Sequence, residues 1–591
     1  MNSEIRTCQN CKADFAIESE DFDFYKKIKV PPPTWCPECR MVRRLTFRND
    51  RSLYRRKCDL CRKDMVAMYP PDTKFPVYCR ECWYSDAWDP LSYGREVDFS
   101  RNFFDQLKDL YDAVPRLALF QINPVNSPFA NGMLDSKNVY LAYSIVKSED
   151  IMYSKSIDRS STVLDSVESV NLEQCYENIN SEKNFNSHFV MYAWNCIDSW
   201  FLYDCANCKH CILSSNLRNK EYVIRNKQYS KDEYFEELKK FDFGSAKALQ
   251  DYKAEYAGVR KNALHKFGNI LKSVNVTGHN MANAKNAKRC FELYNVENVK
   301  YCYRVLDLKD CQDVTYAGWG ELYYEHSNGG NRSSNMHFSV WMLENIRDSE
   351  YMWTCNSAAN LFGCASVKKK EYCILNKQYT PEEYQDLRTK IIAHMNANPH
   401  VDPQGRTWRY GEFFPLHFAE PFGYNETVAQ ELFPLTKEAA LKRGYAWKDM
   451  DAKGHTATKA PEDLPDSIKD VGDDILQEII GCAHKGECNE QCTVAFRVIP
   501  DELQFYRQKG LPLPRLCPNC RHYERLQRME PLRLWKRPCQ CAGANSENLG
   551  WKNGSPHFHG SSHCPNEFQT PYAPDRPEAV YCEQCYQAEV M

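Results

Sequence analysis

The chain has 591 residues, a formal net charge of −3 and a pI near 6.6. Its length exceeds what one hydrophobic core supports and predicts about four domains. The near-neutral charge gives no global field that would draw the chain to nucleic acid or membrane. No apolar run reaches the roughly 18 residues of a membrane-spanning helix, and the first residues lack an apolar signal segment. We therefore expect a cytoplasmic protein without membrane association.

Cysteine pairs with two intervening residues open the chain and predict an N-terminal double zinc module over residues 1–95. Zinc prefers four thiolate or imidazole ligands in a tetrahedron, and a tight turn between paired cysteines presents two sulfurs at once. In a reducing cytosol such pairs indicate metal rather than disulfides. We assign two closed structural sites in sequence order, while a cross-braced pairing of the same cysteines stays open. The first site has Cys8, Cys11, Cys36 and Cys39, and the second has Cys58, Cys61, Cys79 and Cys82.

A basic stretch follows the first site, directly after Cys39. If it forms a helix, arginines at three- and four-residue steps share one face. Guanidinium groups suit phosphate, which predicts binding to RNA or to a ribosomal surface. The alternative is internal electrostatics, in which the arginines balance thiolate charge or face carboxylates elsewhere in the chain. The candidate nucleic-acid-binding residues are Arg40, Arg43, Arg44, Arg48, Arg51, Arg55 and Arg56, with Arg521, Arg525, Arg528 and Arg537 near the C-terminus.

The middle of the chain is a second duplication. Residues 131–228 and 285–378 match at an offset of 150, so that the segment 226–229 repeats as 376–379. Short aromatic and β-branched stretches recur after Asn or Asp every 10 to 15 residues. This pattern predicts two copies of a parallel β-solenoid with Asn and Asp at the corners. An antiparallel sandwich is the alternative.

Cysteines inside both solenoid copies are expected to be small buried residues. Cys205, Cys208 and Cys211 have the spacing of a metal motif, but Cys355 is the one position of the three that keeps its sulfur in the second copy. This difference favours a core role over a metal role. The expected core cysteines are Cys175, Cys196, Cys205, Cys208, Cys211, Cys290, Cys302, Cys311, Cys355 and Cys364.

Helical segments are expected to connect these parts. They comprise a connector over 96–130, an insertion over 229–284, and a helical segment with an acidic linker over 379–475. Ser230 and Thr380 each precede a glutamate by three residues, which is the capping-box pattern of a helix start.

The C-terminal end repeats the N-terminal double zinc module over residues 476–591. Adding 481 carries Cys36 onto Cys517, and adding 503 carries Cys79 onto Cys582, so this copy contains a 22-residue insertion. We expect about four structural zinc ions in the chain, with four thiolates closing each site. The C-terminal ligands are expected to be Cys488, Cys492, Cys517 and Cys520 for one site and Cys539, Cys564, Cys582 and Cys585 for the other.

Further donors near these sites leave alternatives open. Cys482 and His484 are candidate substitutes for Cys488. Histidines in the Gly/Ser/Pro-rich insertion are either ligands of a fifth zinc or ordinary surface residues. The candidates for this additional site are Cys541, His557, His559 and His563.

A search for catalytic motifs yields no P-loop, Rossmann fingerprint, nucleophile elbow or zinc-protease helix. Glu321, Glu325 and His326 form an acid–histidine cluster in the middle of the chain. Such a cluster at a strand edge is more often a surface ladder than a catalytic site. We therefore assign no catalytic residue.

Several specific motifs lie along essentially the whole chain. They are Pro31-Pro-Pro-Thr-Trp-Cys-Pro-Glu-Cys-Arg, Arg56-Lys-Cys-Asp-Leu-Cys, Arg218-Asn-Lys-Glu-Tyr, Gly411-Glu-Phe-Phe-Pro, Tyr424-Asn-Glu-Thr, Leu513-Pro-Arg-Leu-Cys-Pro-Asn-Cys-Arg and Tyr572-Ala-Pro-Asp-Arg. In these motifs the chain resembles an uncharacterised family of zinc-ribbon proteins known mainly from metagenomic bacterial genomes. Some members carry a CoA-transferase label, which the zinc pairs of this chain do not support. The resemblance implies no known activity.

These observations predict a mainly β, multidomain protein in which duplicated zinc-ribbon or treble-clef modules flank a duplicated β-solenoid-like middle. The expected function is a zinc-dependent, non-enzymatic binding protein that engages RNA or the ribosome through its arginine-rich modules. One alternative is a protein-interaction scaffold or a self-assembling structural protein. Another is an enzyme with a site on the solenoid face.

Overall fold

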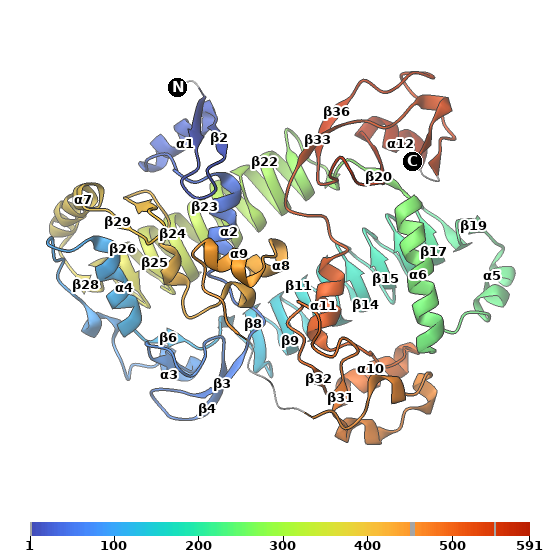
Figure 1. Cartoon of the computed structure of the whole chain (residues 1–591), viewed down its shortest axis with the longest axis horizontal. Helices are drawn as coiled ribbons and strands as arrows, with labels where there is room; N and C mark the ends of the chain where they lie inside the picture. Colours follow the sequence, from blue (N-terminus) through green and yellow to red (C-terminus); the bar gives the residue numbers. More distant parts are fainter. Residues whose placement is uncertain (1–2, 450–455, 549–550) are drawn as a thin grey trace. The chain divides into compact units, whose positions relative to one another are not determined.

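The computed structural model describes residues 3–449, 456–548 and 551–591 (Figure 1). The fold is mainly β, with β-solenoids formed by the middle of the chain and cysteine-rich modules formed by its two ends, as predicted. Strand pairing along the solenoids is parallel, which excludes the antiparallel sandwich. Within the described residues, no helix combines the length and apolarity needed to cross a membrane.

The chain folds into two compact units, and each unit is made of two segments that are far apart in the sequence. Unit 1 combines Met1–Phe120 with Asn269–Lys448, and unit 2 combines Gln121–Gly268 with Asp449–Met591. Each unit therefore joins a cysteine-rich module from one end of the chain to one half of the duplicated middle. The sequence contains no indication of which module packs on which solenoid.

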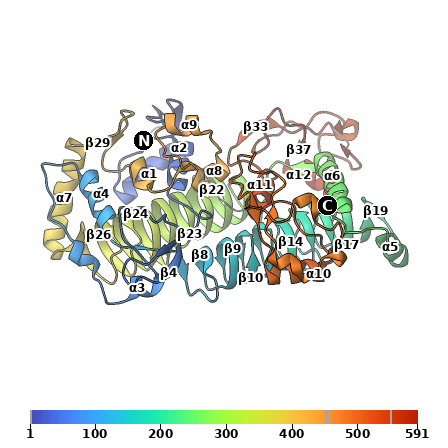
Figure 2. The ribbon, with the colours of Figure 1, turned by 60° about the horizontal axis from the view of Figure 1, so that its bottom comes forward.

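Unit 1 has a solenoid of β21 to β28, whose strands β22 to β26 are seen in Figure 2. Its cysteine-rich module contains the hairpins β1–β2 and β3–β4. Its helices are α1 (Ser19–Ile28), α2 (Pro37–Leu45), α3 (Arg80–Tyr84), α4 (Phe103–Ala113), α7 (Pro381–Ala397), α8 (Val428–Leu432) and α9 (Lys437–Lys442), with 3-10 turns η1 (Pro90–Tyr93), η2 (Leu416–Ala419) and η3 (Tyr424–Glu426). Its strands are β1 (Glu4–Thr7), β2 (Asp14–Ile17), β3 (Tyr54–Lys57), β4 (Asp64–Ala67), β5 (Val77–Tyr78), β6 (Arg116–Leu117), β21 (Ile270–Leu271), β22 (Thr277–Lys300), β23 (Tyr303–Asn331), β24 (Ser333–Glu344), β25 (Ile346–Trp353), β26 (Ala358–Ala365), β27 (Glu371–Ile374), β28 (Lys377–Gln378), β29 (His400–Val401) and β30 (Thr407–Trp408).

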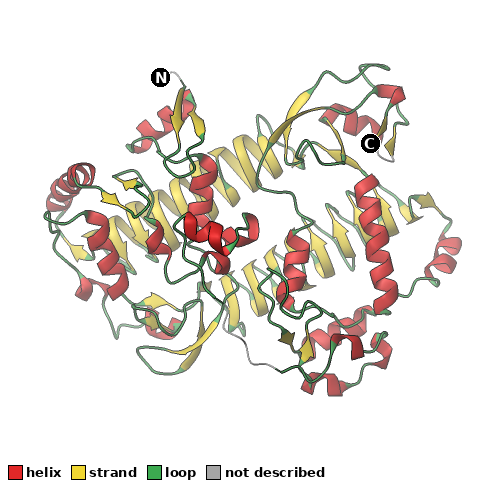
Figure 3. Ribbon diagram, in the orientation of Figure 1, coloured by secondary structure: helices red, strands yellow, loops and turns green. Residues whose placement is uncertain are grey.

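Unit 2 has a solenoid of β7 to β19, drawn as a stack of yellow arrows in Figure 3. Its helices are α5 (Lys231–Leu238), α6 (Ala246–Asn262), α10 (Pro500–Lys509), α11 (Pro518–Leu526) and α12 (Glu583–Val590), with 3-10 turns η4 (Pro461–Asp463), η5 (Ile468–Asp470), η6 (Asp473–Gln477) and η7 (Gly543–Asn545). Its strands are β7 (Gln121–Ile122), β8 (Phe129–Leu134), β9 (Lys137–Val146), β10 (Glu149–Met152), β11 (Lys155–Asp158), β12 (Ser161–Leu164), β13 (Val167–Val170), β14 (Glu173–Ile179), β15 (His188–Met191), β16 (Trp200–Tyr203), β17 (Lys209–Ser215), β18 (Glu221–Ile224), β19 (Lys227–Gln228), β20 (Leu264–Lys266), β31 (Ile480–Gly481), β32 (Ala495–Phe496), β33 (Trp535–Pro538), β34 (Glu547–Asn548), β35 (Trp551–Lys552), β36 (Glu567–Thr570) and β37 (Ala579–Tyr581).

The backbone of each solenoid turn bends at every third residue, so the sides of the turn are short. Neighbouring turns pair in parallel, and each residue lies beside its counterpart one turn later, as Lys137 pairs with Glu149. Left-handed backbone recurs at three-residue steps, for example at Asp150, Tyr153 and Ser156 with φ of 56°, 52° and 58°. Asn and Asp tolerate this conformation best after glycine, because their short polar side chains bond locally. The bends divide each turn into four sides of three residues.

The residue after a bend contributes to the narrow interior and is in most turns small or medium-sized. Ser154 Oγ donates to the carbonyl oxygen of Met152 at 2.9 Å and accepts from the N–H of Ser166 at 3.0 Å. Cys175 takes the same place, and its thiol lies 3.3 Å from the carbonyl oxygen of Glu173. Burial raises the pKa of Cys175 to about 12, so this thiol is protonated at neutral pH. The cysteines expected in the core are all buried, namely Cys175, Cys196, Cys205, Cys208, Cys211, Cys290, Cys302, Cys311, Cys355 and Cys364.

The solenoid of unit 1 contains two turns that are each one residue longer than the regular turn, in which Phe291 pairs with Tyr303. Gly320 pairs with Ser333 in the first of them, and Ser334 pairs with Arg347 in the second. These two extra residues change the offset between the solenoids from 148 to 150.

The predicted helix starts are confirmed. Ser230 Oγ accepts from the N–H of Glu233 at the start of α5, and Thr380 Oγ1 accepts from the N–H of Glu383 at the start of α7. The expected acidic linker is instead packed over its described length. Leu464, along with Ile468, Val471 and Ile475, is buried in the core of unit 2, because these apolar residues recur between the acids.

Asn207 tests the corner geometry of the unit 2 solenoid. Its φ is 54°, and its side chain links Asn195 to Asn219 through amide contacts of 2.9 and 3.0 Å. We expect Asn207→Val to destabilise unit 2 by about 1–2 kcal/mol, because a β-branched residue is strained in left-handed backbone. Asn207→Gly removes the same amide but keeps the dihedral, so it should cost less. Denaturant unfolding of the two variants checks this order, and equal stability of the valine variant and wild type would contradict it.

Candidate metal centres

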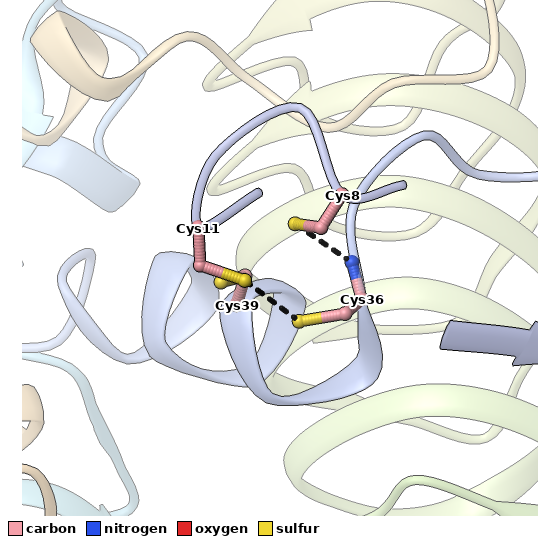
Figure 4. A group of neighbouring side chains, drawn as sticks. All are labelled: Cys8, Cys11, Cys36 and Cys39. Atoms are coloured by element: carbon pink, nitrogen blue, oxygen red, sulfur yellow. Dashed lines mark hydrogen bonds between the residues drawn. The ribbon is translucent and has the colours of Figure 1, made fainter. Parts of the chain in front are cut away.

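Four groups of four cysteines have the geometry of metal sites. In each group the sulfurs lie within 4.8 Å of one another, and they converge on a common centre in the first group (Figure 4). Cys11 and Cys36 are 3.8 Å apart, and Cys61 and Cys79 are 3.9 Å apart, measured between sulfurs. Two sulfurs on one tetrahedral zinc, each bonded at about 2.3 Å, would lie about 3.8 Å apart. The groups are Cys8, Cys11, Cys36 and Cys39; Cys58, Cys61, Cys79 and Cys82; Cys482, Cys492, Cys517 and Cys520; and Cys539, Cys564, Cys582 and Cys585.

These groups decide between the two pairings left open by the sequence. The N-terminal cysteines group in sequence order, so the cross-braced arrangement is excluded. All four positions of each tetrahedron are occupied by protein sulfur, so each group is compatible with a closed structural zinc site.

Each group takes two of its cysteines from the start of a helix, and in the two N-terminal groups the other two come from a tight turn. In the first group, the turn after Cys8 closes with a bond from the N–H of Lys12 to the carbonyl oxygen of Cys8, and Lys12 has φ of 64°. Cys36 caps the N-terminus of α2 and donates its N–H to the sulfur of Cys8 at 3.2 Å. The same N–H to sulfur bond recurs in the other three groups at 3.2–3.3 Å.

Backbone N–H groups surround the sulfur of Cys58. Burial alone would raise the pKa of Cys58, but the N–H groups of Cys61, Cys79 and Leu60 lower it to about 7. Metal ligation needs the thiolate, so this environment suits a metal ion.

One predicted ligand is replaced. The third group contains Cys482 where the sequence analysis placed Cys488. Cys482 accepts the N–H of Cys517 at 3.3 Å, as Cys8 accepts that of Cys36. Cys488 is more exposed, although its sulfur lies 3.7 Å from that of Cys520. The turn carries seven more residues here than at the N-terminus, which hid the correspondence from a search for close cysteine pairs.

The arginines after the first group face the solenoid of unit 1. Arg40, Arg43 and Arg44 lie on α2 and are only 1%, 0% and 0% exposed. Arg40 pairs with Asp313 at 2.8 Å, Arg43 with Glu325 at 2.8 Å, and Arg44 with both carboxylates at 3.1 and 2.9 Å. Asp313 and Glu325 occupy equivalent left-handed bends of adjacent turns. We call these five residues the arginine–carboxylate cluster of unit 1.

This burial corrects the expectation that the ridge binds phosphate. Arg48 is also buried, bonds to Asn328 and stacks 3.7 Å from the ring centre of Tyr316. Burial disfavours the guanidinium charge of Arg40, but Asp313 holds its pKa well above the ordinary value. The internal electrostatic alternative is therefore confirmed for these arginines.

Unit 2 repeats the arrangement with matching residues. Arg521 pairs with Asp165 at 3.0 Å, and Arg525 pairs with Asp165 and Glu177 at 2.8 and 3.1 Å. Arg528 also pairs with Glu177. Arg521 and Arg525 are shifted by 481 from Arg40 and Arg44, and their carboxylate partners are shifted by 148. We call Arg521, Arg525, Asp165 and Glu177 the arginine–carboxylate cluster of unit 2, and burial makes both of its arginines unavailable to phosphate.

The other predicted arginines are placed differently. Arg56 pairs with Asp59 at 2.8 Å, and Arg537 is buried with its guanidinium on the carbonyl oxygen of Ala573. Arg51 is half-buried, whereas Arg55 is exposed on β3.

The acid–histidine cluster of the solenoid is structural. Glu325 belongs to the arginine–carboxylate cluster, and Glu321 is exposed. His326 is buried, with its nitrogens 2.8 Å from Ser339 Oγ and 3.1 Å from the carbonyl oxygen of Gly329. Burial lowers the pKa of His326 to about 4, so the ring is neutral at physiological pH.

Comparison with protein-family models and with curated proteins gives no match for this chain.

Cys482 and Cys488 offer a matched test of the third group. We expect Cys482→Ser to lower the zinc content of the purified chain by one equivalent, because a hydroxyl is a poor substitute for a thiolate. Cys488→Ser should leave the content unchanged. Metal analysis by mass spectrometry on reduced protein measures the zinc content of both variants. Loss of zinc from Cys488→Ser alone would support the ligand set expected from the sequence.

Arg44 tests the arginine–carboxylate cluster of unit 1. Arg44→Ala leaves Asp313 and Glu325 buried with less compensation, so we expect a loss of about 3–5 kcal/mol in the unfolding of unit 1. The exposed Arg55 is the control, and Arg55→Ala should change stability by no more than about 0.5 kcal/mol. Denaturant unfolding measures both, and equal effects would show that the buried pairs contribute little.

Proposed function

We propose that the chain is a zinc-stabilised, non-enzymatic binding scaffold whose partner is a protein. The observation that carries this proposal is the burial of the arginine ridges against solenoid carboxylates. Protein sulfurs fill all four ligand positions of each metal group, and the arginine ridges hold the modules on the solenoids. Both features therefore contribute to stability. The sides of the solenoids are then the surfaces left for a partner. Reduced thiolates are required throughout, which fits a cytoplasmic location.

A polar strip on the unit 2 solenoid is the candidate contact surface. It is a shallow groove of about 600 Å³ that crosses successive turns. Both edges repeat once per turn, and each carries charges of both signs, as Lys137 and Glu149 do in their 2.6 Å pair. Mixed charge at the turn spacing of about 4.8 Å suits an extended protein segment better than a uniformly anionic polymer. The edges are formed by Asn123, Asp135, Lys147, Arg159 and Asn171 and by Val125, Lys137, Glu149, Ser161 and Glu173.

RNA binding is a second candidate, supported by one exposed basic surface. On the hairpin β3–β4, Arg55 and Lys57 lie on one side of a strand, and Arg62 and Lys63 follow in the adjoining turn; all four are exposed. This basic hairpin could contact phosphates without the buried ridges.

One experiment separates the two candidates. The full chain is affinity-purified from its producing cells with and without nuclease, and bound proteins and nucleic acid are quantified. Lys147→Glu with Arg159→Glu alters the polar strip, and Arg62→Glu with Lys63→Glu alters the basic hairpin. We expect a defined protein partner that survives nuclease and is released at about 0.5 M salt, where exposed charge pairs are screened. The strip variant should lose this partner and the hairpin variant should keep it.

Other outcomes contradict the scaffold proposal. Nuclease-sensitive recovery that only the hairpin variant abolishes would favour RNA instead. Identical partners for both variants and the wild type would exclude both surfaces. Zinc content and circular dichroism of each variant show whether it is folded.

A further inference from the structure

A second donor group shares one residue with the last cysteine group. Cys541, His557, His559 and Cys585 offer ligand atoms within 4.8 Å of one another. Cys585 also belongs to the four-cysteine group of the same module. His563, which the sequence analysis included, is exposed and lies outside this set of four.

The spacing of these donors fits one tetrahedral ion. Cys541 Sγ lies 3.5 Å from His557 Nδ1, and His559 Nε2 lies 3.3 Å from Cys585 Sγ. A sulfur at about 2.3 Å and a nitrogen at about 2.0 Å from one tetrahedral zinc would be about 3.5 Å apart. Ordinary packing does not require two imidazoles and two thiols to converge in this way.

The outer nitrogen of each imidazole has an acceptor. His557 Nε2 lies 2.9 Å from Glu589 Oε1, and His559 Nδ1 lies 2.7 Å from the carbonyl oxygen of Ser562. If these nitrogens carry the protons, the inner nitrogens have free lone pairs that face the two sulfurs. A carboxylate or carbonyl behind a ligating histidine is the usual support of a metal site.

The ligand count determines how two ions fit. Two tetrahedral ions need eight donor positions, and the two groups together contain seven residues. A thiolate can bind two ions at once, so a bridging Cys585 supplies the eighth position. Two zinc ions would also offset all but one of the five thiolate charges. The seven residues are Cys539, Cys541, Cys564, Cys582, Cys585, His557 and His559.

We propose that the C-terminal module holds a binuclear zinc centre in which the Cys585 thiolate bridges the two ions. This centre is specific to one end of the chain. Both histidines come from the 22-residue insertion, and a shift of 481 places Leu60 opposite Cys541. The proposal does not depend on the partner proposed above, because it concerns metal content alone.

Metal content is the first test. We expect the purified, reduced chain to contain about five zinc ions, one more than the four-cysteine groups supply. His557→Ala with His559→Ala should remove one equivalent, whereas His563→Ala, the control from the same insertion, should remove none. Glu589→Gln should weaken the additional site by roughly 10–100-fold in a chelator competition. A wild-type content of four that the double histidine variant leaves unchanged would overturn the proposal.

Cadmium NMR tests the bridge itself. In protein loaded with ¹¹³Cd, two resonances should show scalar coupling to each other through the shared sulfur. The double histidine variant should lose one of these resonances and the coupling of the other. Cys585→Ala should shift or remove both. Five bound ions with no coupled pair would mean separate sites and would exclude the bridge.

Discussion

Charge pairing inside the protein is the constraint on which the rest of the structure depends. Arg44 and Arg525 each reach two carboxylates, and the arginines and their partners are almost fully removed from water. Buried charges are costly unless they are paired, so neither the module nor the solenoid tolerates loss of the other's charges. The first cysteine group is linked directly to this contact, because Cys36 caps the helix that carries the arginines. Binding of a metal by this group would thus be coupled to docking through one short helix.

The helix that carries the arginines matches the solenoid surface because the repeat distances of the two are similar. Residues four apart on a helix are separated by a rise of about 6 Å, and adjacent solenoid turns are about 4.8 Å apart. Arg40 and Arg44 can therefore reach Asp313 and Glu325, which stand one turn apart. Glu177 in unit 2 has its pKa set by the same balance: burial raises it, but Arg528 and Arg525 lower it to about 2. Each module thus packs along a ladder of solenoid charges.

Much of the metal chemistry could be predicted from sequence because ligand pairs are local, as Cys58 and Cys61 are. Spacing favours Cys488 over Cys482, whose turn is longer, because spacing alone does not report which sulfur accepts an N–H. The Asn and Asp corners predict the solenoid but not its exact period, because small inward residues such as Ser154 give little hydrophobic signal. The arginine partners could not be found, because Arg40 and Asp313 lie in distant segments of the chain and nothing local links them.

The pairing of distant segments sets an order for synthesis. The segment Met1–Phe120 leaves the ribosome well before its partner Asn269–Lys448, because the solenoid segment of unit 2 lies between them. During that interval the cysteine turns could already hold metal, while Arg40, Arg43 and Arg44 would still face solvent. A nascent chain would therefore display a cationic helix that the finished protein conceals. Truncation before Asn269, where the solenoid segment of unit 1 begins, would leave this helix permanently uncovered. Incomplete products would therefore differ from the mature protein in surface charge as well as in length.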